Sequence, residues 1–145
     1  MKIPILLACL AMVSILGGSG SDSSPRKLGY AVSKLLDNIR KIESNGDCSK
    51  IGKVGELGCY QIRECYWIDA LEHDPSIGGE YEDVIDREYA EEVILAYWDR
   101  YATIKRLGHI PTDEDRARIH NGGPNGHKKT STIKYWNKIK KELND

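Results

Sequence analysis

Glu43 stands at the end of a segment with helical periodicity, and Gly46 follows it closely. Counting back from it, Ile39, Leu36 and Val32 fall at i−4, i−7 and i−11, so its carboxylate lies on the apolar side of the expected helix. Burial and the negative end of the helix dipole both raise a carboxyl pKa, and a raised pKa suits a general acid near neutral pH. Glu43 is therefore the first candidate for acid catalysis, and a solvent-facing glutamate at a helix end is the alternative.

A second group of polar residues lies in a glycine-rich loop much later in the chain. Its candidate sugar contacts are His120, Asn121, Gly122 and Gly123. Imidazole, amide and free backbone N–H groups are the donors and acceptors that recognise sugar hydroxyl and N-acetyl groups. The loop is a candidate for carbohydrate binding, and a plain turn between two helices is the alternative.

Five helices are expected to position these residues. Periodicity and capping signals predict them at about 30–44, 63–72, 86–107, 112–120 and 131–143. Between the first two, residues 49–62 carry glycines at three-residue intervals together with β-branched side chains, which is typical of a small irregular β-hairpin. The predicted fold class is therefore α+β and predominantly helical.

The N-terminus has the pattern of a secretory signal peptide over residues 1–20, where Lys2 precedes an apolar run that ends in small residues. The run is shorter than the roughly 20 apolar residues that span a bilayer, so we expect cleavage and no membrane anchor. Residues 21–29 are expected to be a flexible lead-in, and residues 30–145 a single domain. The mature protein is expected to be secreted.

Charge and cysteine content limit the partners. Removing the signal peptide takes away Lys2 and no acidic residue, which leaves 20 basic against 22 acidic residues, and this net charge of −2 argues against a nucleic-acid partner. Three cysteines remain, and an oxidising compartment permits one disulfide and leaves one free thiol. We favour the pair Cys48 and Cys59, which would join the helix exit to the hairpin. The spacing does not fit a zinc site, and no metal or cofactor is expected.

Five short segments carry a family resemblance. They are Glu43-Ser44, 58–62 (GCYQI), 66–70 (YWIDA), 117–124 (ARIHNGGP) and 132–138 (TIKYWNK). In this order they resemble the invertebrate-type lysozymes of the destabilase family, over roughly residues 34–140. The resemblance implies a lysozyme-like domain with a cleft between hairpin and helices. It also implies a secreted glycoside hydrolase that acts on the β-1,4-linked amino-sugar backbone of bacterial peptidoglycan, or on chitooligosaccharides.

The resemblance assigns roles to single residues. Glu43 matches the general acid, Tyr60 and Gln61 match the hairpin exit that lines the cleft, and the 120–123 loop is part of the sugar site. Some destabilases are described as isopeptidases in which a histidine at the position of His120 is implicated. No convincing partner nucleophile accompanies that histidine in this sequence.

The family pairs its glutamate with a hairpin aspartate, and in this chain that position falls at or beside Lys53. A retaining glycosidase needs two carboxylates about 5 to 5.5 Å apart, and lysine cannot supply one. Glu56 is the candidate for a relocated second carboxylate, with a solvated side chain as the alternative reading, and Asp47 is a more remote substitute. Three functions stay open, in this order: a lysozyme with a relocated carboxylate, a single-glutamate enzyme like the lytic transglycosylases, and a sugar-binding protein without catalysis.

Overall fold

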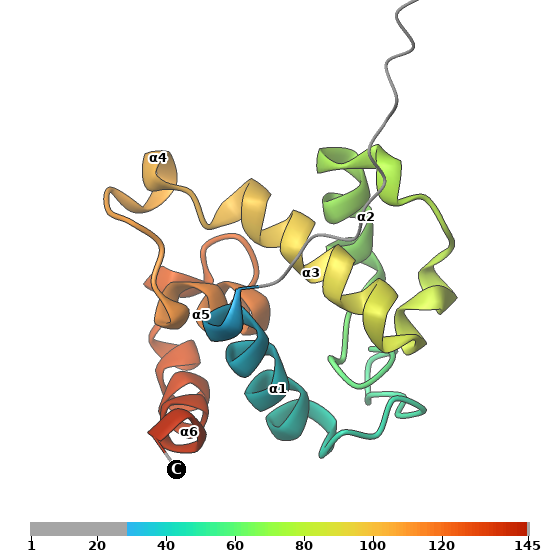
Figure 1. Ribbon diagram of the computed structural model, residues 1–145, viewed down its shortest axis with the longest axis horizontal. Coiled ribbons are helices and arrows are strands. Elements are labelled where there is room, and N and C mark those ends of the chain that lie inside the picture. The colour runs from blue at the N-terminus through green and yellow to red at the C-terminus, as the bar shows by residue number, and fades with distance from the viewer. Residues whose placement is uncertain (1–28, 145) are drawn as a thin grey trace, which may run out of the picture.

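The computed structural model describes residues 29–144 and is built mainly from helices (Figure 1). The α-helices are α1 (Tyr30–Ser44), α2 (Glu64–His73), α3 (Arg87–Tyr101), α4 (Ile104–Leu107), α5 (Asp113–Gly122) and α6 (Ile133–Asn144). Short 3-10 turns are η1 (Pro75–Ile77), η2 (Tyr81–Ile85), η3 (Gly126–Lys128) and η4 (Thr130–Thr132). The mostly helical fold class is confirmed. The predicted signal peptide, and all of the predicted lead-in except Gly29, lie outside the described residues.

Helix α3 lies against both α2 and α5, while α6 lies against α1 and α5 (Figure 1). The core is formed by fully buried aliphatic side chains, among them Leu35 and Ile39 from α1, Val93 and Ile94 from α3, and Ile119 from α5. This core fixes the end of α1 relative to the end of α5. None of the helices in the described part of the chain is long and apolar enough to cross a membrane.

Local capping explains where most helices begin. Asp86 accepts a hydrogen bond from the backbone N–H of Tyr89 at the start of α3, and Thr112 forms a reciprocal capping box with Asp115 at the start of α5, both as predicted. The predicted continuation of the third helix to residue 107 is wrong. The side chain of Thr103 caps a separate short helix, α4, by accepting from Arg106 N–H, so the chain turns there.

The predicted hairpin is present only as two isolated antiparallel bridges, in which Leu57 pairs with Ile51 and with Ile62. No longer ladder forms among the described residues. The reason is the backbone at Gly55, Gly58 and Gln61, whose φ angles are 89°, 75° and 49°. Positive φ at such short intervals turns the chain repeatedly and prevents an extended strand.

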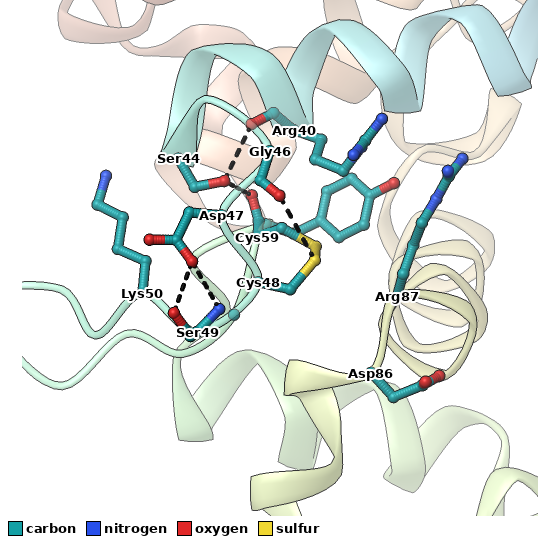
Figure 2. Close-up of a disulfide and its surroundings, with 12 residues drawn as sticks. Arg40, Ser44, Gly46, Asp47, Cys48, Ser49, Lys50, Cys59, Asp86 and Arg87 are labelled. Carbon is teal, nitrogen blue, oxygen red and sulfur yellow. Dashed lines mark hydrogen bonds between the residues drawn. A yellow bond between two sulfur atoms is a disulfide. The ribbon is translucent and has the colours of Figure 1, made fainter.

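The predicted disulfide between Cys48 and Cys59 is confirmed, and it joins the start of the loop that follows α1 to its return segment (Figure 2). The Ser44 hydroxyl at the helix end donates a hydrogen bond of 2.8 Å to the carbonyl of Cys59, which holds the loop's return segment beside the last turn of α1. Cys65 is the free thiol among the described cysteines and is exposed. The end of α1 and the bridged loop therefore form one connected unit.

Candidate active site

Glu43 lies in the last turn of α1, with its side chain 19% exposed. Burial raises the pKa of its carboxyl above the ordinary value of 4.5, and the nearby Tyr135 and Lys50 oppose that rise. The side chain lines a cleft of about 1050 Å³. The residue therefore combines a raised pKa with access to a space large enough for a ligand.

The cleft is lined by residues from four parts of the fold. They include Glu43 from α1, Lys50, Lys53, Glu56, Gln61 and Arg63 from the bridged loop, Tyr66, Asp69 and Tyr97 from α2 and α3, and residues 120–124, Lys129 and Thr132 from the last turn of α5 and the chain that follows it. Glu43 and His120, which are 77 positions apart in the sequence, therefore line the same cleft. Both ends of the predicted sugar site are brought together.

His120 is held in place by hydrogen bonds to two protein groups. Its Nε2 lies 3.1 Å from the carbonyl oxygen of Tyr60, and its Nδ1 lies 3.3 Å from the hydroxyl of Tyr66. Burial lowers the pKa of the imidazole to about 4, although the Tyr60 carbonyl acts in the opposite direction. A neutral ring with Nε2–H donating to the carbonyl satisfies both contacts.

The same ring lies beside the candidate general acid, because Nε2 of His120 is 4.0 Å from Oε1 of Glu43. At neutral pH the imidazole is uncharged, so this contact is not an ion pair. A protonated imidazole at this distance would favour the carboxylate and lower the pKa of Glu43. The neutral ring instead excludes water from Glu43 without adding positive charge.

The two residues predicted at the hairpin exit behave differently. Gln61 lines the cleft, and its side-chain amide donates to the carbonyls of Gly58 and Lys50 at 2.8 and 3.2 Å. The Tyr60 side chain is fully buried, and its hydroxyl donates to Glu91 at 2.6 Å. The prediction that Tyr60 lines the cleft is therefore wrong for its side chain. Its contribution is the backbone carbonyl that orients His120.

Glu56 lines the cleft but is also bonded within its own loop. Its carboxylate accepts from Arg63 at 3.0 and 3.3 Å and from the backbone N–H of Val54 at 3.1 Å. Partial burial would raise the pKa of this carboxyl, but the backbone N–H donors and Arg63 outweigh it and hold the pKa below its ordinary value. Gly52 leaves room for this carboxylate, because a Cβ there would lie 2.2 Å from it and the Glu56 side chain would have to move.

The remaining acidic candidate is placed elsewhere. Asp47 accepts from the backbone N–H and hydroxyl of Ser49 at 2.9 and 2.6 Å, an arrangement that stabilises the turn after α1 (Figure 2). It is not part of the cleft lining. Lys53, at or beside which the sequence predicts the family's aspartate position, lines the cleft and is exposed.

Asn121, Gly122 and Gly123 line the same cleft, but the predicted loop begins later than expected, because Asn121 and Gly122 form the last residues of α5 and Gly123 is its C-cap. A Cβ on Gly122 would lie 2.5 Å from the methyl group of Thr132, so the chain can pass this point only as glycine. Gly123 has a φ of 80°, which turns the chain away from α5. Lys129 donates to the carbonyl of Gly122 at 2.6 Å and fixes the loop from the other side.

Sequence reasoning gave no role to three tyrosines at the site. Tyr66 stacks on Tyr97 with ring centroids 3.5 Å apart, and both rings line the cleft. Tyr135, from α6, has its hydroxyl buried close to the Glu43 carboxyl, where it can donate to the ionised carboxylate and so oppose the raised pKa of Glu43. Its place within the TIKYWNK segment was the available signal. No group of three or more metal-ligating side chains occurs among residues 29–144.

Comparison with known proteins agrees with this geometry. The profile of the Destabilase family matches residues 33–142. The chain is 37% identical to the lysozyme of Meretrix lusoria over 119 residues, which cover 78% of this chain and 91% of that protein. It is 36% identical to the invertebrate-type lysozyme of Ruditapes philippinarum over 128 residues, which cover 84% and 87%.

Solved structures lead to the same family. The crystal structure of inhibitor-bound lysozyme from Meretrix lusoria matches with a TM-score of 0.62 at 36% identity, over 74% of this chain and 87% of that chain. The lysozyme of Tapes japonica matches with a TM-score of 0.61 at 33% identity, over 74% and 87%. These matches span most of the domain, including both ends of the cleft. The chain therefore belongs to the destabilase family and is a lysozyme-like glycoside hydrolase.

Proposed function

We propose that this protein is a secreted enzyme that hydrolyses the β-1,4 linkages of bacterial peptidoglycan, with Glu43 as the general acid. The observation that carries the proposal is the placement of Glu43, a partly buried carboxyl with a raised pKa at the wall of a large cleft. A carboxyl group of this kind stays protonated at higher pH than an ordinary glutamate. It is therefore able to give its proton to a glycosidic oxygen when the bond breaks.

Glu56 supports the proposal as the second carboxylate. Its hydrogen bonds with Arg63 and the Val54 N–H keep its pKa low, so it is ionised where Glu43 is still protonated. Two carboxyl groups whose pKa values are driven apart in one cleft are the arrangement that separates an acid role from a charge-stabilising role. Both side chains line the cleft, and the charge of Glu56 contributes to the raised pKa of Glu43.

The reaction then follows from these two groups. Glu43 donates its proton to the glycosidic oxygen, and the bond from that oxygen to the anomeric carbon breaks as positive charge develops on the sugar ring. The carboxylate of Glu56 stabilises this charge electrostatically. A water molecule adds at the anomeric carbon, and its proton returns to Glu43, which restores the starting state. Gln61 and the backbone of the 121–123 loop supply hydrogen-bonding groups for the sugar.

A single-glutamate reaction is the second candidate, because a lysine stands at the position of the family's aspartate. In that reaction no second carboxylate is needed, and the product is an anhydro-sugar instead of a new reducing end. The two products differ in mass by one water. Mass spectrometry of the products therefore separates the two candidates directly.

The test is incubation of the purified mature protein with peptidoglycan and with chitooligosaccharides between about pH 4 and pH 8, the range in which carboxyl and imidazole groups titrate. Glu43→Gln should abolish product formation while sugar binding survives. Glu92→Gln, on an exposed position of α3, removes a carboxylate that does not line the cleft and should leave activity unchanged. Undiminished hydrolysis by the Glu43→Gln variant would contradict the proposal.

A further inference from the structure

The cleft holds more positive charge than the chain as a whole, whose net charge is −1. Arg63 is paired with Glu56, and Asp69 is paired with Arg100 outside the cleft lining. Three lysines of the lining, Lys50, Lys53 and Lys129, form no ion pair within the described part of the chain. Lys50, Lys53, Arg63 and Lys129 outnumber the acidic residues Glu43, Glu56 and Asp69 in the lining, so the cleft carries a net positive charge.

Lys53 differs from the other two lysines. The ammonium group of Lys50 donates to the carbonyl of Glu43, and that of Lys129 donates to the carbonyl of Gly122, so both hold the backbone of the site. Lys53 makes no hydrogen bond and no ion pair with any residue in the range 29–144, and it is exposed on the cleft wall. Its charge is therefore available to a ligand.

Two apolar side chains flank this lysine on the same loop. Ile51 is 71% exposed and Val54 is 69% exposed, and both line the cleft. A bare glycan offers mainly hydroxyl and acetamido groups, which make little use of branched alkyl side chains. A peptide with carboxylates and small alkyl side chains fits this surface better, because its carboxylates can pair with Lys53 and its alkyl groups can pack on Ile51 and Val54.

The loop that carries these three side chains has a fixed shape. Glu56 accepts from the backbone N–H of Val54 and closes the turn, and Gly52 leaves the space that the Glu56 carboxylate fills. The bridge between Ile51 and Leu57 closes the loop at its base. A preformed loop loses little conformational freedom when it binds a ligand, which favours recognition by these exposed side chains.

We propose that Ile51, Lys53 and Val54 form a subsite for the acidic peptide stems of peptidoglycan, so that the cleft prefers stem-bearing strands to bare glycan. The proposal rests on the proposed function for its choice of polymer. It gives the lysine at the family's aspartate position a role in substrate selection. Chitooligosaccharides, which carry no carboxylates, would bind without this contribution.

The test compares binding of stem-bearing glycan strands with binding of bare strands, for which chitooligosaccharides of the same length are used because they carry neither peptide stems nor carboxylates. Binding is measured by calorimetry in the Glu43→Gln background, so that no strand is cleaved. The background variant should bind stem-bearing strands about three- to tenfold more tightly, the range of one partly exposed charge contact. Adding Lys53→Gln should remove most of this preference and leave the affinity for bare strands unchanged.

Two further variants control for other causes. Lys105→Gln makes the same change of charge on α4, outside the cleft lining, and should alter neither affinity. Val54→Thr keeps the branched shape but adds a polar group, and it should weaken stem binding even at high salt, where the lysine contribution is screened. Equal affinity for both strands, or an equal loss on both strands with Lys53→Gln, would overturn the proposal.

Hydrolysis by the wild-type protein is measured separately on the same two strands. Binding with a stem preference but without hydrolysis would overturn the proposed function and support the subsite. Hydrolysis of both strands without a preference in binding would support the proposed function and overturn the subsite. The two failures are thus distinguishable.

Discussion

Replacing Glu56 with glutamine separates two roles for this side chain. In its structural role, Glu56 forms an ion pair with Arg63 and accepts a hydrogen bond from the Val54 N–H. Glutamine at this position would lose the ion pair but keep an oxygen that can accept the hydrogen bond. As the second carboxylate, it supplies a negative charge to the reacting sugar, which glutamine cannot do. Stability and turnover therefore report on different roles.

The expected loss of stability is small. The Arg63 side chain is 62% exposed, so its pair with Glu56 is screened by water and contributes at most about 1 kcal/mol. The backbone hydrogen bond from Val54 is retained in weaker form, for a further loss of about 0.5 kcal/mol. Glu56→Gln should lower the free energy of unfolding by about 1 kcal/mol, or the Tm by about 4 °C. The variant stays folded at room temperature.

The expected loss of turnover is large. Removing the group that stabilises charge in the transition state should lower kcat by about 10² to 10⁴-fold on soluble peptidoglycan strands, with little change in KM. Arg63→Gln is the matched control, because it removes the same ion pair and leaves the carboxylate, and its kcat should stay within about tenfold of wild type. A folded Glu56→Gln variant with kcat within tenfold of wild type would refute the assignment of Glu56 as second carboxylate.

Three further outcomes are expected. Tyr135 lowers the pKa of Glu43, so Tyr135→Phe should raise that pKa and move the alkaline limb of the kcat/KM profile to higher pH. An unchanged limb would contradict an interaction between Tyr135 and the Glu43 carboxyl. Burial lowers the pKa of His120 from 6.5 in the unfolded chain to about 4 in the folded protein. The stability that comes from keeping this ring neutral is fully present above pH 6.5, and the free energy of unfolding should fall by about 3 kcal/mol as the pH drops from 6.5 toward 4. Urea titrations at several pH values should detect this loss, and His120→Gln should flatten it. Cys48→Ala with Cys59→Ala should lower the free energy of unfolding by about 3 kcal/mol, given the separation of 11 residues; no change in Tm would contradict it.

Helix positions were predictable where the signals are local. The bounds of α1 match the prediction, and the caps at Asp86 and Thr112 are used as expected. The break after Tyr101 was missed because the apolar and aromatic stripe continues to Ile104, while the cap made by Thr103 interrupts the helix. A side-chain cap within a periodic segment competes with the helix and is easily overlooked in a sequence.

The candidate site was predictable in part. Glu43 and the 120–123 loop were identified from residue type and spacing, and both line the cleft. The direction of the Tyr60 side chain was not predictable, because Gly58 and Gln61 both have positive φ and the alternation of an extended strand does not apply there. Sequence distance also conceals Tyr135, which reaches Glu43 only because α6 packs against α1.

A lysine at or beside the expected aspartate position does not decide the chemistry by itself, because the pKa of each carboxyl is set by its surroundings. The pKa of Glu43 is raised because its carboxyl is buried, beside the neutral ring of His120. Glu56 is ionised because Arg63 and the Val54 N–H bind its carboxylate. The same loop that carries Lys53 thus presents an ionised carboxylate three residues later, braced against Gly52. With Glu56 as the second carboxylate, the loop still presents one negative charge to the sugar, three residues after Lys53. The side chain of Lys53 is then available to bind another part of the substrate.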